Sequence, residues 1–95
     1  SLDECLDSLK ITRWFAVSTR GQTRYDQPAF VPGDAFVFGP ETRGLPAETL
    51  ERCPPDRRLF LPMYPDNRSL NLSNAVAVVA FQAWRQQGFT GAARR

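Results

Sequence analysis

The stretch DAFVFGPETRGLPAETLERC, residues 34–53, passes from an apolar run through a polar loop into an amphipathic segment. Its first six residues, DAFVFG, are mostly apolar and rich in Phe and Val, which predicts a buried β-strand. Pro46 stands at the start of a predicted helix over residues 45–53, and a pair of prolines ends that helix. An apolar strand that is followed by a loop and then by a helix is typical of a parallel sheet covered on both faces.

The same alternation continues on either side of this stretch. Two more apolar runs, RWFAVST at residues 13–19 and RRLFLPM at residues 57–63, predict strands, and residues 29–31 predict a short edge strand. Apolar side chains recur at helical spacing over residues 2–10 and again over residues 73–87, with a glycine as the stop. The apolar face of the second helix would carry Val76, Val79, Ala80, Ala83 and Trp84. We therefore expect an α/β domain built on a parallel sheet.

The composition excludes several classes of function. The 95 residues suffice for one domain and carry a formal net charge of +2, with eleven Arg against one Lys. Arg holds phosphate with a planar fork, which suits a nucleic-acid partner, although a coding bias towards Arg would give the same composition. The absence of His excludes Ser-His-Asp hydrolysis, His general-base catalysis and the usual zinc sites. No apolar run is long enough to cross a bilayer.

Loops of unusual composition follow three of the predicted strands: STRG, GPETRGLP and PMYPDNRSLNLSN. Ligands of parallel sheets bind beyond the carboxyl ends of the strands, so a site is expected at these loops. The second loop has neither the Gly spacing and Lys of a phosphate-binding loop nor a G-x-G-x-x-G fingerprint. The alternative is an ordinary strand-to-helix loop in which Glu41 pairs with Arg43.

The heptapeptide RSLNLSN, residues 68–74, precedes the last predicted helix and contains more polar residues than one cap requires. We expect Ser73 to cap the helix, with Asn74 in its first turn and the two leucines packed inward. The polar residues left without a structural role are Arg68, Ser69 and Asn71. A hydroxyl, an amide and a guanidinium beside a helix N-terminus suit a ligand with carbonyl, carboxylate or phosphate oxygens.

Taken together, these loops resemble the motifs of a known family. FGPETRGLP resembles the second motif, and LPM followed by RSLNLSNAVAVV the third, of the SpoU/TrmH family of RNA ribose 2′-O-methyltransferases in the SPOUT superfamily. The ending AFQAWRQQGFTGA is most similar to members that methylate the wobble nucleotide of tRNA. The resemblance runs from Arg13 to Ala92. It implies a parallel-sheet SPOUT fold with a C-terminal trefoil knot, S-adenosylmethionine as cofactor, tRNA as partner, no metal, a homodimer and a cytoplasmic location.

The resemblance also assigns roles to individual positions. The cofactor cleft would be formed by Val17, Gly39, Leu61, Ser69 and Leu70. The polar catalytic positions of the family match Glu41, Ser69 and Asn71. The arginines expected to contact RNA phosphates are Arg43, Arg68, Arg94 and Arg95. Trp84 and Phe89 would face a second protomer, unless Trp84 completes the core of the monomer.

One departure from the family concerns its first motif, in which an N-terminal βαβ region supplies an Asn and an Arg. Nothing before residue 10 matches it. We therefore expect residues 1–95 to be the C-terminal part of a single methyltransferase domain lacking the N-terminal strands, with residues 91–95 as a flexible tail. The alternative functions are methylation of ribosomal RNA or another tRNA position, binding of cofactor or RNA without turnover, and a purely structural α/β role.

Overall fold

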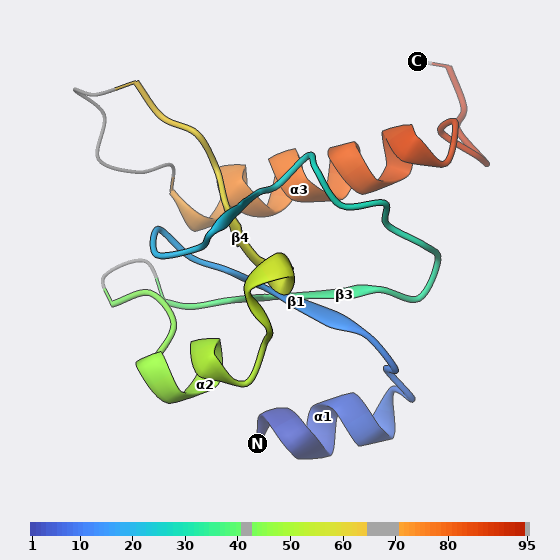
Figure 1. Cartoon of the computed structure of the whole chain (residues 1–95). Helices are drawn as coiled ribbons and strands as arrows, with labels where there is room; N and C mark the ends of the chain where they lie inside the picture. The colour runs from blue at the N-terminus through green and yellow to red at the C-terminus, as the bar shows by residue number, and fades with distance from the viewer. Residues whose placement is uncertain (41–42, 65–70, 95) are drawn as a thin grey trace.

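The computed structural model describes residues 1–40, 43–64 and 71–94 of the chain. Within these residues one sheet is formed by β1 (Trp14–Val17), β2 (Thr23–Arg24), β3 (Ala35–Phe38) and β4 (Arg58–Phe60). The helices are α1 (Leu2–Ser8), α2 (Ala47–Glu51), the 3₁₀ turn η1 (Pro55–Arg57) and α3 (Leu72–Gln86). The strand order is β2-β4-β1-β3, and every neighbouring pair is parallel (Figure 1). The predicted α/β class with a parallel sheet is confirmed.

The predicted edge strand at residues 29–31 is wrong, because these residues form no strand and the short strand at one edge of the sheet is β2. The backbone of Tyr25 donates to the carbonyl of Phe60 at 3.0 Å, which continues the pairing of β2 with β4. Phe30 is instead a buried loop residue whose N–H donates to the side chain of Gln86 at 2.8 Å. Prolines at positions 28 and 32 remove two of the backbone donors that a strand would need.

Alternate residues of β1 supply two separate cores, one on each face of the sheet. Phe15 and Val17 pack with Val79 of α3, whereas Ala16 packs with Leu50 of α2 and with Cys53. Figure 1 accordingly shows α3 on one side of the sheet and α1 and α2 on the other. A strand buried on both faces must be apolar at every position, which explains the continuous apolar run in the sequence.

The N-cap of helix α3 lies two residues earlier than the sequence suggests. Asn71, in an extended conformation, is the N-cap, and its Oδ1 accepts the N–H of Asn74 at 2.9 Å. The prediction that Ser73 caps the helix is therefore wrong, because Ser73 already lies within the first turn. Only part of the predicted apolar face is buried: Val79 is 1% exposed, but Val76 is 41% exposed.

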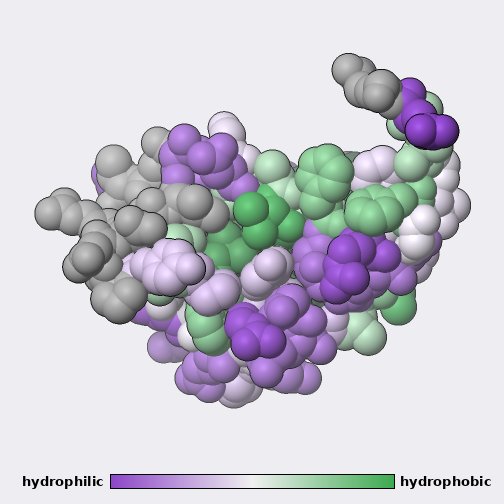
Figure 2. All heavy atoms as spheres, turned by 90° about the horizontal axis from the view of Figure 1, so that it is seen from above, coloured by the Kyte–Doolittle hydropathy of each residue, from purple (hydrophilic) through white to green (hydrophobic). Residues whose placement is uncertain are grey.

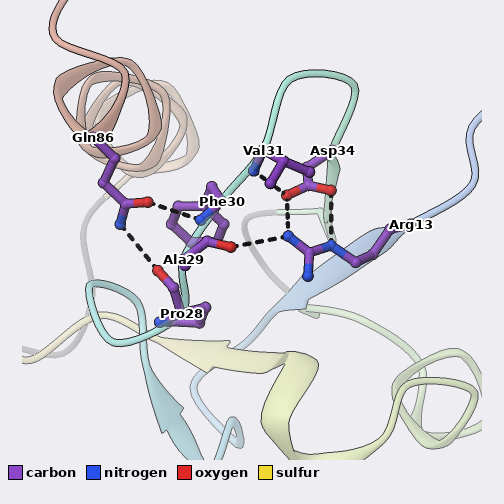
Figure 3. A network of polar contacts seen from close by, with 7 residues as sticks. All are labelled: Arg13, Pro28, Ala29, Phe30, Val31, Asp34 and Gln86. Atoms are coloured by element: carbon purple, nitrogen blue, oxygen red, sulfur yellow. Dashed lines mark hydrogen bonds and ion pairs between the residues drawn. The ribbon is translucent and has the colours of Figure 1, made fainter.

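A partly buried ion pair ties the loop before β3 to the start of β1 (Figure 3). Arg13 holds Asp34 through two hydrogen bonds of 2.8 and 2.6 Å, and Asp34 also accepts the N–H of Val31. Nη2 of Arg13 and Nε2 of Gln86 donate to the carbonyls of Ala29 and Pro28, respectively. The hydrogen bonds from Arg13 lower the pKa of Asp34 from its ordinary value against the opposing effect of burial. This network fixes the C-terminal end of α3 to the rest of the fold.

Two further expectations about the fold concern the C-terminal knot and the lack of a segment long enough to cross a membrane. The predicted C-terminal trefoil knot concerns the chain before α3, where residues 65–70 lie outside the described residues, so the knot stays a prediction. Among the helices that the structure describes, none is long and apolar enough to cross a membrane.

Candidate functional site

The register of the sheet brings three of the predicted cofactor residues together. Val17 pairs with Phe38 on one side and with Leu59 on the other. Gly39 directly follows Phe38, and Leu61 lies two residues beyond Leu59. Because neighbouring strands are about 4.8 Å apart, these three residues line the carboxyl ends of adjacent strands. This is the edge at which parallel sheets bind ligands.

Gly39 is required by a close approach of two backbone segments. A Cβ atom on Gly39 would overlap the backbone of Gly44 and Leu45. The turn between them is closed by a hydrogen bond of 2.8 Å from the Gly44 N–H to the Pro40 carbonyl, and Leu45 is buried in the core. Gly39 therefore presents backbone, and no side chain, at the edge of the candidate site.

The loop after β1 contributes a residue that our sequence analysis missed. The guanidinium of Arg20 donates through Nη2 to the carbonyl of Leu45 at 2.5 Å. The backbone N–H of Arg20 donates to Oγ of Ser18, and the Ser18 N–H in turn donates to the Leu59 carbonyl. The signal in the sequence was the STRG loop itself, but its composition does not reveal which backbone group the arginine reaches.

Asn71 is the first described residue of the heptapeptide RSLNLSN and the N-cap of α3. Helix α3 begins on the side of the molecule where β1 and β3 end (Figure 1). The Oδ1 of Asn71 is committed to the helix cap, whereas the capping bond does not use its amide nitrogen Nδ2. Asn71 is exposed, so Nδ2 is able to donate to a ligand.

The other predicted site residues divide into two groups. Those that lie outside the described residues are Glu41, Arg68, Ser69, Leu70 and Arg95. Arg43 is exposed beside Gly44 in the loop that follows β3. Arg94 is exposed beyond the far end of α3, and a helix of 15 residues spans about 22 Å. Within this chain, Arg94 is therefore not brought to the residues at the carboxyl ends of the strands.

A cavity of about 410 Å³ lies at the opposite end of the sheet. It is lined partly by residues that precede or begin strands, such as Arg13, Thr23 and Arg57, and partly by residues 27–29 of the loop after β2. Arg13 is committed to Asp34, and the buried Nε of Arg57 has no hydrogen-bond partner among the described residues. Because ligands of parallel sheets bind at the carboxyl ends, we assign the candidate site to the strand ends and not to this cavity.

The outer surface of α3 carries exposed apolar side chains, which Figure 2 shows from the side of this helix. Val76, Phe81 and Phe89 are 41%, 59% and 40% exposed. The ring of Trp84 lies between those of Phe81 and Phe89, with centroid distances of 5.8 and 5.2 Å. Trp84 is half-buried and is part of neither core cluster of the described residues, so its place against a second protomer or in the monomer core stays a prediction.

Known proteins are similar to this chain in sequence and in fold. A protein-family model described as the SpoU rRNA Methylase family matches residues 1–81. A curated relative from Burkholderia ambifaria, named tRNA (cytidine(34)-2′-O)-methyltransferase, is 67% identical over 81 residues, which are 85% of this chain and 52% of the relative. The chain spans about half the length of the curated relatives it matches.

Solved structures agree with these sequence matches. A structure assigned as an RNA methyltransferase from Bacillus anthracis is 35% identical, with a TM-score of 0.85, and the match covers 100% of this chain and 61% of that one. A structure that concerns the 2-OH methylation of C/U34 on tRNA is 47% identical, with a TM-score of 0.73. That match covers 80% of this chain and 45% of the other.

Proposed function

This chain belongs to the SpoU rRNA methylase family, and from that premise we propose that it forms part of an enzyme that methylates a ribose 2′-hydroxyl of tRNA. The proposed target is nucleotide 34, the position named for the Burkholderia ambifaria relative. The observation that carries the proposal is the 67% identity to that relative over 85% of the chain. The convergence of strand ends at Val17, Gly39 and Leu61 supports it independently.

We propose S-adenosylmethionine as the cofactor, which would supply the methyl group when bound. The described residues fit such a group because Val17, Gly39 and Leu61 offer backbone and apolar surface at adjacent strand ends. Gly39 in particular leaves its edge of the site free of a side chain. The proposed cofactor contacts of Ser69 and Leu70 rest on the family resemblance.

The proposed catalytic residues are Glu41, Ser69 and Asn71. Methyl transfer requires the ribose oxygen to lie in line with the methyl carbon and its proton to be removed or loosened. Asn71 is rigidly placed by its capping bond to Asn74, so its Nδ2 can hold a ribose or cofactor oxygen in a fixed direction. Glu41 would accept a hydrogen bond from the hydroxyl, a role that rests on the family resemblance.

We also propose that the enzyme acts as a homodimer in the cytoplasm, where tRNA is modified. The exposed Val76, Phe81 and Phe89, together with the half-buried Trp84, support the dimer because apolar side chains that lie together on a surface favour association. Arg43, Arg68, Arg94 and Arg95 are proposed to contact the tRNA backbone. In a homodimer, Arg94 and Arg95 of one protomer would contact tRNA bound at the site of the other protomer, so the length of α3 would not separate them from that site.

The test is a transfer assay with the intact enzyme and tritiated-methyl S-adenosylmethionine. Two tRNA transcripts are compared that differ only at nucleotide 34, which carries a ribose in one and a 2′-deoxyribose in the other. The proposal predicts incorporation into the first transcript and none into the second. Equal labelling of both would overturn the proposed target, and labelling of ribosomal RNA alone would favour the rRNA activity in the family's description.

A further inference from the structure

Arg20 joins two loops that lie at the carboxyl ends of different strands. It belongs to the loop after β1, and its Nη2 donates to the carbonyl of Leu45, which follows the loop after β3. The bond is partly buried, although the residue as a whole is exposed. A charged donor on a backbone carbonyl makes one of the stronger hydrogen bonds in proteins.

Both partners of this bond are themselves held in place. On the Arg20 side, the Arg20 N–H donates to Oγ of Ser18 at 3.1 Å, and the Gly21 N–H donates to the Ser18 carbonyl at 3.0 Å. A Cβ on Gly21 would collide with the backbone of Leu59 and Phe60, so this loop lies tight against β4. On the other side, the side chain of Leu45 is 4% exposed within the core cluster that includes Ala16.

The consequence concerns the backbone around Gly39. Gly39 packs so closely on Gly44 and Leu45 that a shift of Leu45 must move Gly39 or open the contact between them. Arg20 is the described side chain that donates to the Leu45 carbonyl. The geometry therefore links Arg20, through Leu45, to the strand end that we assign to the cofactor.

We propose that Arg20 is a positioning residue of the cofactor site, which fixes the loop after β3 against the end of β1 without touching the cofactor itself. The proposal rests on the proposed function. The competing role is direct contact with RNA phosphate, since an exposed arginine beside the site could also make one. The bond to Leu45 favours the positioning role because it already occupies the Nη2 donor of the guanidinium.

The experiment measures the affinity for S-adenosylhomocysteine by calorimetry, without RNA, in the intact enzyme and three variants. Arg20→Met keeps the aliphatic stem and removes the donor, and Arg20→Lys restores a charged donor of similar length. Arg52→Met is the matched control, because Arg52 pairs with Asp3 of α1 and its guanidinium lies over the ring of Trp14, the first residue of β1. Thermal melting accompanies each titration, and Arg20→Gln replaces Arg20→Met if the latter does not fold.

We expect Arg20→Met to weaken cofactor binding about tenfold, the effect of losing one hydrogen bond from a charged group. Arg20→Lys should bind within about threefold of the parent, and Arg52→Met should match it. In the transfer assay the KM for S-adenosylmethionine should rise while kcat stays close to that of the parent.

Three outcomes would overturn the inference. The first is Arg20→Met binding S-adenosylhomocysteine as tightly as the parent. The second is a loss of tRNA affinity with unchanged cofactor affinity, which would assign Arg20 to RNA contact. The third is a parent enzyme that binds no S-adenosylhomocysteine, and this result would overturn the proposed function as well.

Discussion

At the scale of single residues, Asp34 shows how a charge is kept inside this fold. Its side chain is 3% exposed and is satisfied by Arg13 and by the backbone of Val31 (Figure 3). The partner guanidinium is 37% exposed, so water screens part of the attraction. Removing one member of such a pair leaves the other charged group without its partner, which destabilises the folded state.

We predict that Asp34→Asn lowers the free energy of unfolding at pH 7 by about 2 kcal/mol. The pKa of Asp34 is lower in the folded protein than in the unfolded chain, chiefly because of the hydrogen bonds from Arg13. The stabilisation is therefore present above about pH 4, the unfolded value, and is lost as the pH falls through the folded pKa. Urea titrations at several pH values should show the difference between parent and variant shrinking below pH ~4.

The control for this prediction is Asp26→Asn, which breaks an ion pair with Arg24 at the surface. Its effect on stability should be the smaller of the two because the side chains of Arg24 and Asp26 are 50% and 34% exposed, so water screens their attraction more. A difference between parent and Asp34→Asn that stayed constant from pH 7 to pH 3 would contradict the role given to the carboxylate.

Asn71 has two roles to separate, one in capping α3 and one in the proposed chemistry. Asn71→Ala removes both and should cost about 1 kcal/mol of stability together with most of the activity. Asn71→Ser keeps a capping oxygen but removes Nδ2, so it should keep the stability and lose the activity. Melting curves and transfer assays on the same samples decide between the roles, and Ser73→Ala, which leaves the cap intact, serves as control. Full activity in Asn71→Ser would return Asn71 to a purely structural role.

At the scale of elements, the sequence predicts what depends on periodicity and misses what depends on contacts. β1, β3, β4, α1 and α2 lie within the predicted ranges, and α3 begins one residue before its predicted range, because buried strands are apolar throughout and helices repeat every three or four residues. β2 is too short to have a pattern, and its place depends on backbone bonds to β4. The exposure of Val76 could not be predicted either, because periodicity identifies a face but not whether a partner covers it.

The candidate site likewise contains one feature that the sequence predicts and one that it does not. The convergence of Val17, Gly39 and Leu61 follows from the order and parallel direction of the strands, so a motif at each strand end is enough to predict it. The bond from Arg20 to Leu45 joins residues 25 positions apart and involves a carbonyl that every residue type possesses. No pattern of side chains could reveal it.

The loop after β3 should not tolerate any side chain at Gly39. We predict that Gly39→Ala destabilises the protein by about 1–3 kcal/mol, because the added Cβ overlaps the backbone of Gly44 and Leu45. The affinity for S-adenosylhomocysteine should fall in the same variant. Gly91→Ala is the control, since its Cβ would meet no atom within 4 Å and only its positive φ is unfavourable. Equal stability of Gly39→Ala and the parent, measured by urea titration, would contradict the close approach.

At the scale of the whole molecule, α3 divides its side chains between the sheet and the outside. Val79 completes the core, whereas Phe81, Trp84 and Phe89 form an aromatic group on the outer surface (Figure 2). Phe81 is 59% exposed, so its replacement should leave the core intact. An apolar surface of this kind on the proposed dimer helix would be covered by a second copy.

We predict that the intact enzyme sediments as a dimer at micromolar concentration and that Phe81→Glu shifts it towards the monomer. The reason is that a carboxylate buried in an apolar interface without a partner is strongly unfavourable. The control is Val31→Glu. Val31 is 51% exposed and lies in the loop before β3 and not on α3, so this change should leave the dimer unchanged. A parent protein that sediments as a monomer would rule out this use of the α3 surface.

The central claim is that the cofactor binds at the carboxyl ends of the strands and not in the cavity at their amino ends. Amide chemical shifts of the intact enzyme, recorded by NMR during titration with S-adenosylhomocysteine, test it most directly. We predict saturable changes at Val17, Gly39, Leu61 and Asn71, with little change at the cavity residues Arg13, Thr23 and Arg57. Changes that cluster at the cavity residues and spare the strand ends would contradict the claim.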